Sequence, residues 1–337
     1  MIYKAFFDLQ PEGLHLEDVN ISIEKDGLAY GKGRIDYADI LSLKPVNHRV
    51  IISLLEGKQA VISMLGFSFD GFWEELLRCF GVRTAESLFI EEEKLMECDA
   101  EYQLPVLSNP MVASGILPYE SIRNTDVEMG RGRVQLYTDS ICILPETCHA
   151  IRVPLCFTSD ISLDGYLLHI RMRGGEEYMV GRMGNDTHPF AERAIRQAKK
   201  VKEKREERLF HVGLTEPFTE KGLFRTADED TYWLAAFGKN SCAVELFTAE
   251  KTATYLYIFM DKRLFVYALE EAMEAVGTHR ELIFLPEEEL VQKPLYRMAV
   301  ARSGAVRFLR RCSAGRIIHS ATHDEKLREF LDLEKVL

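Results

Sequence analysis

Hydrophobic and polar residues follow the same pattern in two stretches of the chain, residues 52–77 and residues 170–195. The two stretches align without a gap, at a constant separation of 118 residues. In each stretch the pattern reads as a strand, a glycine-containing turn, a second strand and then a glycine. After that glycine, apolar residues recur at i, i+1, i+4, i+5 and i+8, which is the stripe of an amphipathic helix. The pattern therefore predicts one strand–turn–strand–helix unit that occurs twice.

The junction between the last strand and the helix contains a glycine in both copies. Gly66 and Gly184 stand at this junction, and we attribute both to a tight turn and not to phosphate binding, since glycine is the residue that such turns favour. Asp70 suits a cap of the first helix, and Pro189 suits the first turn of the second. The helical spacing around Trp73 indicates core packing and not a platform for stacking nucleic-acid bases.

Upstream of the aligned stretches the two copies still correspond, but the sequence match predicts a separation that differs from 118 residues. The segment IDYADILSL at residues 35–43 resembles LCFTSDISL at residues 155–163. Matching them places Asp39 on Asp160, which predicts a connection about three residues longer in the first copy than in the second.

Still earlier, each copy contains another predicted strand pair. These are VNISIEKDGLAYG at residues 19–31, where Asp26-Gly27 is a hairpin signal, and RVQLYTDSICILP at residues 133–145. Each copy is therefore predicted to be several short antiparallel strands closed by one C-terminal helix. This arrangement resembles the pleckstrin-homology-like (PH-like) fold, a bent β-sandwich plugged at one end by a helix. The resemblance is architectural and covers about residues 15–80 and 130–200.

The remaining segments have other patterns. Residues 91–133 are rich in Pro, Asn, Ser and Gly without a sustained period, which predicts a connector. Residues 191–210 continue the second helix with alternating basic and acidic residues. From about residue 209 the chain mixes helix and strand patterns. The predicted elements there are a strand at 252–260, a helix at 262–277, a strand at 280–285 and a closing helix at 323–337.

Together these patterns predict a mostly β fold with an α+β part: two PH-like helix-capped β-sandwich or barrel domains in tandem, followed by a C-terminal α+β domain. The predicted domains are residues 1–98, residues 99–208 with the connector, the second β-domain and the extended helix, and residues 209–337.

The amino-acid composition adds information about the class of protein and its partners, but not about the fold. The 337 residues are 47% hydrophobic and 28% charged, which is typical of globular domains. No signal peptide or membrane-spanning run is apparent, so we expect a cytoplasmic protein. The net charge of −11 disfavours nucleic acid and anionic membranes and mildly favours a basic partner. Seven scattered cysteines without a C-x-x-C pair indicate reduced thiols.

Two groups of residues are candidates for ligand binding. His319 and His323 have the i, i+4 spacing of a metal site, with Arg316 and Asp324 nearby. However, Thr322 begins a T-x-x-E capping box, which places His319 outside the helix, so we predict no metal site.

The second group lies around the first hairpin. Lys25, Lys32 and Arg34 resemble the loose basic pattern with which lipid-binding members of the PH fold grip inositol phosphates. Nearby acidic residues, among them Asp36 and Asp39, offset this charge, so membrane binding is disfavoured.

No motif for a nucleophile, a phosphate loop or a calcium loop is present, so we predict no catalytic residue and no cofactor. The leading hypothesis is a non-catalytic cytoplasmic binding or scaffold protein that recognises a protein or peptide at a strand edge or beside a capping helix. The alternative is an enzyme or ligand sensor with a site in the C-terminal domain around Arg316, His319, His323 and Asp324, together with His279.

Overall fold

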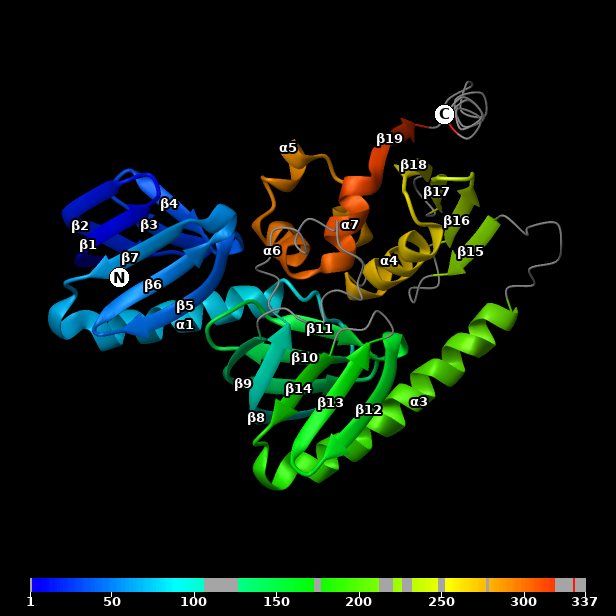
Figure 1. Cartoon of the computed structure of the whole chain (residues 1–337), viewed down its shortest axis with the longest axis horizontal. Coiled ribbons are helices and arrows are strands. Elements are labelled where there is room, and N and C mark those ends of the chain that lie inside the picture. Colours follow the sequence, from blue (N-terminus) through cyan, green and yellow to red (C-terminus); the bar gives the residue numbers. More distant parts are fainter. Residues whose placement is uncertain are drawn as a thin grey trace. The chain divides into compact units, whose positions relative to one another are not determined.

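The computed structural model describes residues 2–105, 127–172, 177–211, 221–225, 232–247, 252–276, 279–318 and 330. Two compact units are distinguished in the chain. Unit 1 consists of Met1–Ala198 and Pro286–Gly304, and unit 2 consists of Lys199–Leu285 and Ala305–Leu337. Unit 1 contains two seven-stranded sheets, and unit 2 contains one five-stranded sheet. The chain is therefore mostly β with a small number of helices, as the sequence predicts (Figure 1).

The first sheet is antiparallel and has the strand order β4-β3-β2-β1-β7-β6-β5. Its strands are β1 (Ile2–Gln10), β2 (Leu14–Ile23), β3 (Gly27–Tyr30), β4 (Gly33–Asp36), β5 (Ile40–Val46), β6 (Arg49–Leu54) and β7 (Gln59–Ser63). The 3-10 turns η1 (Tyr37–Asp39), η2 (Leu55–Gly57) and η3 (Gly66–Ser68) interrupt it, and helix α1 (Phe69–Glu86) follows it.

The second sheet is antiparallel and has the order β11-β10-β9-β8-β14-β13-β12, which is the same topology as the first. Its strands are β8 (Lys94–Pro105), β9 (Val127–Tyr137), β10 (Ser140–Pro145), β11 (Ile151–Pro154), β12 (Thr158–Asp164), β13 (Leu167–Met172) and β14 (Glu177–Gly181). The turns η5 (Leu155–Phe157) and η6 (Gly184–Asp186) and the long helix α3 (Thr187–His211) complete it.

The two sheets repeat each other over a longer range than the sequence comparison indicated. From β4 and β11 through α1 and α3, every pair of equivalent strands and helices begins 118 residues apart. The predicted three-residue shift between residues 35–43 and 155–163 is therefore wrong, because Ile40 corresponds to Thr158 and both side chains are fully buried. The β-bulge near the start of β5 also recurs at the same place in β12.

The two copies do differ in the length of the hairpin that precedes this segment, which is β3–β4 in the first sheet and β10–β11 in the second. Two residues separate Tyr30 from its strand partner Gly33 in the first sheet, whereas seven separate Ile143 from its partner Ile151 in the second. The second sheet therefore has five additional residues between these strand partners, and they include the end of β10 and the β10–β11 loop.

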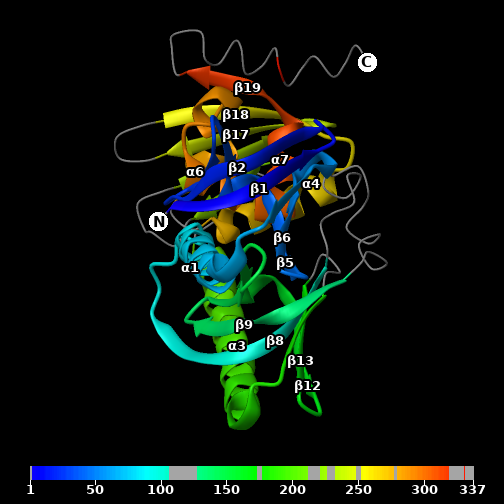
Figure 2. The same cartoon turned by 90° about the vertical axis from the view of Figure 1, so that its left-hand side faces the viewer.

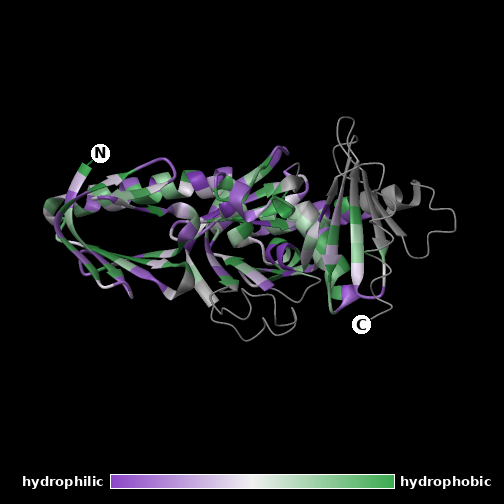
Figure 3. Ribbon diagram, turned by 90° about the horizontal axis from the view of Figure 1, so that it is seen from above, coloured by the Kyte–Doolittle hydropathy of each residue, from purple (hydrophilic) through white to green (hydrophobic). Residues whose placement is uncertain are grey.

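Helix α1 closes the first core along its predicted apolar stripe. Phe72, Leu76 and Phe80 are fully buried on this helix, and Trp73 packs against the same cluster, so the prediction that Trp73 belongs to the core is confirmed. The ring of Tyr3 contacts Phe72 edge-on with centroids 5.0 Å apart. Colouring by hydropathy shows green and purple residues alternating along the strands, as expected for sheets with one buried face (Figure 3).

The strand-to-helix junctions contain the predicted tight turns. Gly66 and Gly184 have φ values of 56° and 59°, in the left-handed region that favours glycine. The prediction that Asp70 caps α1 is wrong: the helix begins at Phe69, and Asp70 lies in its first turn, where the carboxylate faces the positive end of the helix dipole.

The predicted connector at residues 91–133 is partly a sheet. Its two ends form β8 and β9, the longest strands of the second sheet, which pair from Lys94 to Pro105 (Figure 2). The predicted domain boundary after residue 98 therefore falls inside β8. Residues 106–126, which supplied most of the turn-forming composition, lie outside the described part of the chain.

Unit 2 contains an antiparallel sheet in the order β15-β16-β17-β18-β19. Its strands are β15 (Lys221–Arg225), β16 (Tyr232–Phe237), β17 (Ser241–Phe247), β18 (Thr252–Ile258) and β19 (Ser313–Ile318), and its helical elements are α4 (Lys262–Ala275), η7 (Arg280–Ile283) and α7 (Gly304–Cys312). Asp261 caps α4 through Oδ1, which accepts hydrogen bonds from the backbone N–H groups of Arg263 and Leu264 at 2.8 and 3.0 Å.

The predicted strand at 252–260 and helix at 262–277 are confirmed by β18 and α4. The predicted strand at 280–285 is wrong, because this segment contains the 3-10 turn η7 and buries Leu282 and Ile283 in succession. The predicted closing helix at 323–337 lies outside the described residues, apart from residue 330. Residues 286–304, which we had placed in the C-terminal domain, belong to unit 1.

Candidate binding groove

The additional residues of the β10–β11 loop dock on the first sheet. The backbone N–H of Leu43, on edge strand β5, donates to the carbonyl of Thr147 at 2.8 Å. Nε2 of His149 lies 2.6 Å from the carbonyl oxygen of Ile40 and must carry the proton, because a carbonyl only accepts. The imidazole also contacts the ring of Phe80 at 5.4 Å. We call this contact the seam; it joins the two sheets of unit 1.

Replacing His149 with alanine is expected to lower the free energy of unfolding by about 1–3 kcal/mol, because it leaves the buried Ile40 carbonyl without its donor. The measurement is urea denaturation of the full chain. His188→Ala is the matched control: this histidine is exposed on α3, and its loss is expected to change stability by less than about 0.5 kcal/mol. Equal effects of the two substitutions would contradict the role of His149.

The C-terminal end of α1 packs on the outer face of the second sheet. Leu88, just after the helix, forms a buried cluster with Cys142 and Leu144 of β10 and with Ala150. Ala85 packs partly against the same cluster. One helix thus closes the core of the first sheet with its early turns and covers part of the second sheet with its end.

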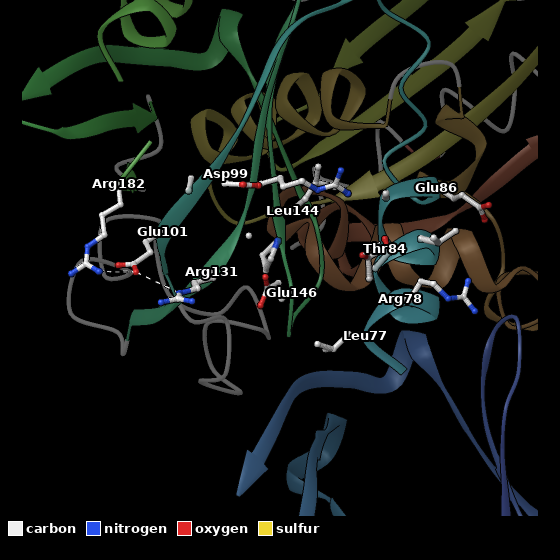
Figure 4. Close-up of a pocket in the computed structure, with 17 residues that line it drawn as sticks. Leu77, Arg78, Thr84, Glu86, Asp99, Glu101, Arg131, Leu144, Glu146 and Arg182 are labelled. Atoms are coloured by element: carbon white, nitrogen blue, oxygen red, sulfur yellow. Dashed lines mark hydrogen bonds and ion pairs between the residues drawn. The ribbon is translucent and has the colours of Figure 1, made fainter. Parts of the chain in front are cut away.

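Beside this contact lies a groove of about 1050 Å³, with α1 as one wall and the outer face of β8, β9 and β10 as the other (Figure 4). The helix contributes Leu77, Gly81 and Val82, and Val82 is half exposed. The remaining lining residues are Arg78, Thr84, Ala85, Glu86, Asp99, Ala100, Glu101, Arg131, Gly132, Arg133, Leu144, Pro145, Glu146 and Arg182. The helix wall is therefore partly apolar and the sheet wall is charged.

The charges on the sheet wall are arranged by the strand register. Glu101 of β8 stands opposite Arg131 of β9, and its Oε1 lies 3.8 Å from Nε of that arginine and 3.0 Å from Nη1 of Arg182. Asp99 also stands opposite Arg133 in the strand register, and Nη1 of Arg133 pairs with Oε1 of Glu97 at 2.8 Å. The arginine side chains are largely exposed, so each ion pair contributes little to folding and its groups can exchange one charged partner for another at low cost.

Two glycines explain why β9 can present these arginines. A Cβ on Gly132 would lie 2.3 Å from the carbonyl oxygen of Leu144, and a Cβ on Gly130 would lie 2.7 Å from the hydroxyl of Tyr102. The sequence GRGR at residues 130–133 is thus a strand with glycines on its crowded face and arginines on its groove face. The period-2 alternation of glycine and arginine is the sequence signal for such a strand.

The charged side chains that line the groove are carboxylates and guanidinium groups. Its 17 lining residues include no histidine, cysteine or serine. The hydroxyl of Thr84 is buried and donates to the carbonyl of Gly81 at 3.1 Å, so it does not face the groove as a nucleophile. Among the residues that the structure describes, no cluster of three or more His, Cys, Asp or Glu side chains is placed to hold a metal ion.

Burial raises the pKa of two cysteine thiols, one in each unit. Burial raises the pKa of Cys98 to about 11, with the carboxylates of Asp186 and Asp99 adding to the effect. Burial likewise raises the pKa of Cys312, in unit 2, to about 11. The nucleophilic thiolate is therefore a minor form of both residues at neutral pH.

The structure separates the three basic residues of the predicted anion site. Lys25 lies in the turn before β3 and Lys32 in the turn after it, so they stand at opposite ends of that strand. Arg34 is paired with Glu24 and with Asp36, whose Oδ1 lies 2.6 Å from Nε of the arginine. The hydrogen bond to Asp36 is the main cause that raises the pKa of Arg34. The geometry therefore does not form a common basic site.

In unit 2, Arg316 is an exposed residue of β19 and stands opposite Tyr255 of β18. His279 lies between α4 and η7. His319, His323 and Asp324 lie outside the described residues, so a site that includes them stays a prediction.

Comparison with known proteins gives no family assignment. No protein-family model matches the chain, and no curated protein matches it. In the part of the chain that the structure describes, every helix is too short or too polar to span a membrane.

Proposed function

We propose that this protein is a non-catalytic binding or scaffold protein, and that its groove between α1 and the second sheet holds a peptide segment of a partner protein. The observation that carries the proposal is the groove itself: about 1050 Å³, partly apolar on the helix wall, charged on the sheet wall and lined by no histidine, cysteine or serine. A volume of this size is in the range of ligand-binding clefts.

The proposed architecture is a tandem of PH-like domains. Support comes from the two copies of seven antiparallel strands followed by one helix, in the same strand order. A scaffold of this kind suits recognition, since residues from a helix and from a sheet surround the bound segment. The two domains share α1, and the seam keeps the groove walls at a fixed distance.

The groove selects the chemistry of its partner. A hydrophobic side chain of the bound segment would pack on Leu77 and Val82 of the helix wall. Flanking charged residues would pair with Glu101 and Arg131 on the sheet wall, in exchange for the exposed pair that these two side chains form with each other. The net charge of −11 would favour the approach of a partner that is basic overall.

The proposal is tested by selecting peptides from a random library against the full chain and measuring their affinities for two variants. Gly81→Trp fills the groove, and an added Cβ at this position meets no atom within 4 Å, so the fold is expected to survive. We expect a loss of at least about tenfold in affinity, which corresponds to about 1.4 kcal/mol.

Gly71→Trp is the matched control, because Gly71 lies in the same helix, is equally open and does not line the groove. Its peptide affinities are expected to equal those of the unmodified chain. Peptides that bind Gly81→Trp and the unmodified chain equally well, or a selection that yields no binding peptide, would contradict the proposal.

A further inference from the structure

A short helical segment of unit 1 is separated from the rest of that unit in the sequence. Residues Pro286–Gly304 include helices α5 (Glu287–Leu290) and α6 (Pro294–Arg302), and they belong to unit 1 although the chain before and after them belongs to unit 2. Helix α6 contacts η1 and α1 of the first β-domain. The chain therefore leaves unit 2, places one helix on the first β-domain and returns.

In the polar part of this contact, one arginine of α6 is held by two carboxylates of the first β-domain. Nη1 of Arg297 lies 2.8 Å from Oδ2 of Asp36, and its Nη2 donates to Oδ1 of Asp39. The side chain of Arg297 is 21% exposed, and those of Asp36 and Asp39 are 29% and 36% exposed. Water and salt ions reach all three groups, so the strength of this contact depends on ionic strength.

Apolar residues of α6 also take part in the contact, and both Met298 and Ala299 are fully buried. Met298, which is 1% exposed, inserts into the core cluster of the first sheet, and Leu295 packs partly against it. The ring of Tyr296 meets Phe89 edge-on at 5.6 Å. A helix of nine residues is marginal on its own in water, so α6 depends on its packing against the first β-domain for its structure.

The two carboxylates are specific to the first β-domain. The positions 118 residues after Asp36 and Asp39 are Pro154 and Phe157, neither of which can pair with an arginine. We call Asp36, Asp39 and the apolar pocket that receives Met298 the seat. The repeat topology is common to both sheets, whereas the seat exists on one of them.

We propose that the seat is a helix-binding site that α6 occupies reversibly, and that a basic helix with the same side-chain pattern can replace it from another protein. The pattern is a leucine, an arginine two positions later and a methionine directly after it, as in Leu295, Arg297 and Met298. Gly304 is the last residue of the inserted segment, and an added Cβ there meets no atom within 4 Å.

The test uses a fluorescent synthetic peptide of residues 286–304 as the competing helix and anisotropy as the measurement. In the unmodified chain the internal α6 occupies the seat, and apparent affinity falls in proportion to the fraction of vacant seats. Arg297→Glu in the full chain vacates the seat. We expect this variant to bind the unmodified peptide at least about tenfold more tightly than the unmodified chain does.

The charge requirement is tested by reversal. A chain with Asp36→Lys and Asp39→Lys is expected not to bind the unmodified peptide and to bind a peptide that carries Arg297→Glu. Circular dichroism identifies any variant that fails to fold. Equal binding of the peptide by the unmodified and Arg297→Glu chains, or retained binding after the double lysine substitution, would overturn the proposal.

A second measurement, amide hydrogen exchange of the unmodified chain, tests reversible occupation without any substitution. Amides of α6 are expected to exchange faster than those of Phe72 to Phe80 in α1, and to exchange faster still when salt is added. Identical exchange rates of the two helices at low and high salt would show that α6 opens only when the whole unit unfolds, and would contradict reversible occupation.

Discussion

Replacing Phe80 with alanine is expected to lower the free energy of unfolding of unit 1 by about 3–5 kcal/mol. Phe80 is fully buried in the last part of the α1 stripe. Its ring meets Tyr37 at 5.5 Å and His149 at 5.4 Å, so it belongs both to the core of the first sheet and to the seam. The substitution leaves a cavity in the core of the first sheet and removes a ring contact from the seam.

Denaturant titration of the full chain measures this loss, and Arg78→Ala is the control, because Arg78 is exposed on the same helix. The equivalent position of the second β-domain is Ala198, which is buried as well. The small residue there shows that the fold tolerates alanine at this position when the surroundings fit it. A loss of less than about 1 kcal/mol for Phe80→Ala would mean that the seam and core rearrange around the cavity.

Replacing Gly132 with alanine is expected to destabilise unit 1 by about 1–3 kcal/mol or more, because the new Cβ would lie 2.3 Å from the backbone carbonyl oxygen of Leu144. That oxygen belongs to the neighbouring strand and cannot move like the end of a flexible side chain. The strand pair must therefore separate locally, which also displaces Arg131 and Arg133 from the groove wall.

Gly81→Ala is the matched substitution, and we expect it to raise the free energy of unfolding where Gly132→Ala lowers it. Gly81 lies inside α1, with no atom within 4 Å of an added Cβ, so alanine there is expected to stabilise the helix by about 0.5–1 kcal/mol. Thermal unfolding of the two variants tests both expectations. A stable Gly132→Ala chain, or one that is affected as little as Gly81→Ala, would contradict the close packing of β9 against β10.

The repeat could be predicted because it rests on local patterns. Alternating residues and the stripe through Phe72 and Phe80 depend only on neighbours in the sequence, and they gave the correct spacing for the last strands and the helix. The strands upstream were misaligned, because the match of Asp39 to Asp160 compared residue types and ignored which of them face the core. Asp39 lies in η1, whereas Asp160 is an exposed strand residue that pairs with Arg171.

The groove and the seat could not be predicted in the same way, because contacts between distant parts of the chain create them. The groove needs Val82 of α1 and Arg131 of β9 on opposite walls, and the seat needs Arg297 next to Asp36. No local period indicates such pairs. Averaging the composition of residues 91–133 also hid β8 and β9, since turn-forming residues between them dominated the segment.

The basic residues selected from the sequence illustrate the same limit. Spacing alone suggested that Lys25, Lys32 and Arg34 cooperate, but β3 holds the two lysines apart and Arg34 pairs with Asp36. The other oxygen of Asp36 then binds Arg297. A residue that appeared to belong to an anion site therefore supports the carboxylate that receives α6.

The most direct test of the central claim is a crystal structure of the full chain with the tightest peptide from the library selection. The groove proposal predicts that the peptide lies between α1 and the second sheet, with an apolar side chain on Leu77 and Val82 and a charged one at Glu101 or Arg131. A peptide bound at any other surface, with the groove open, would contradict it.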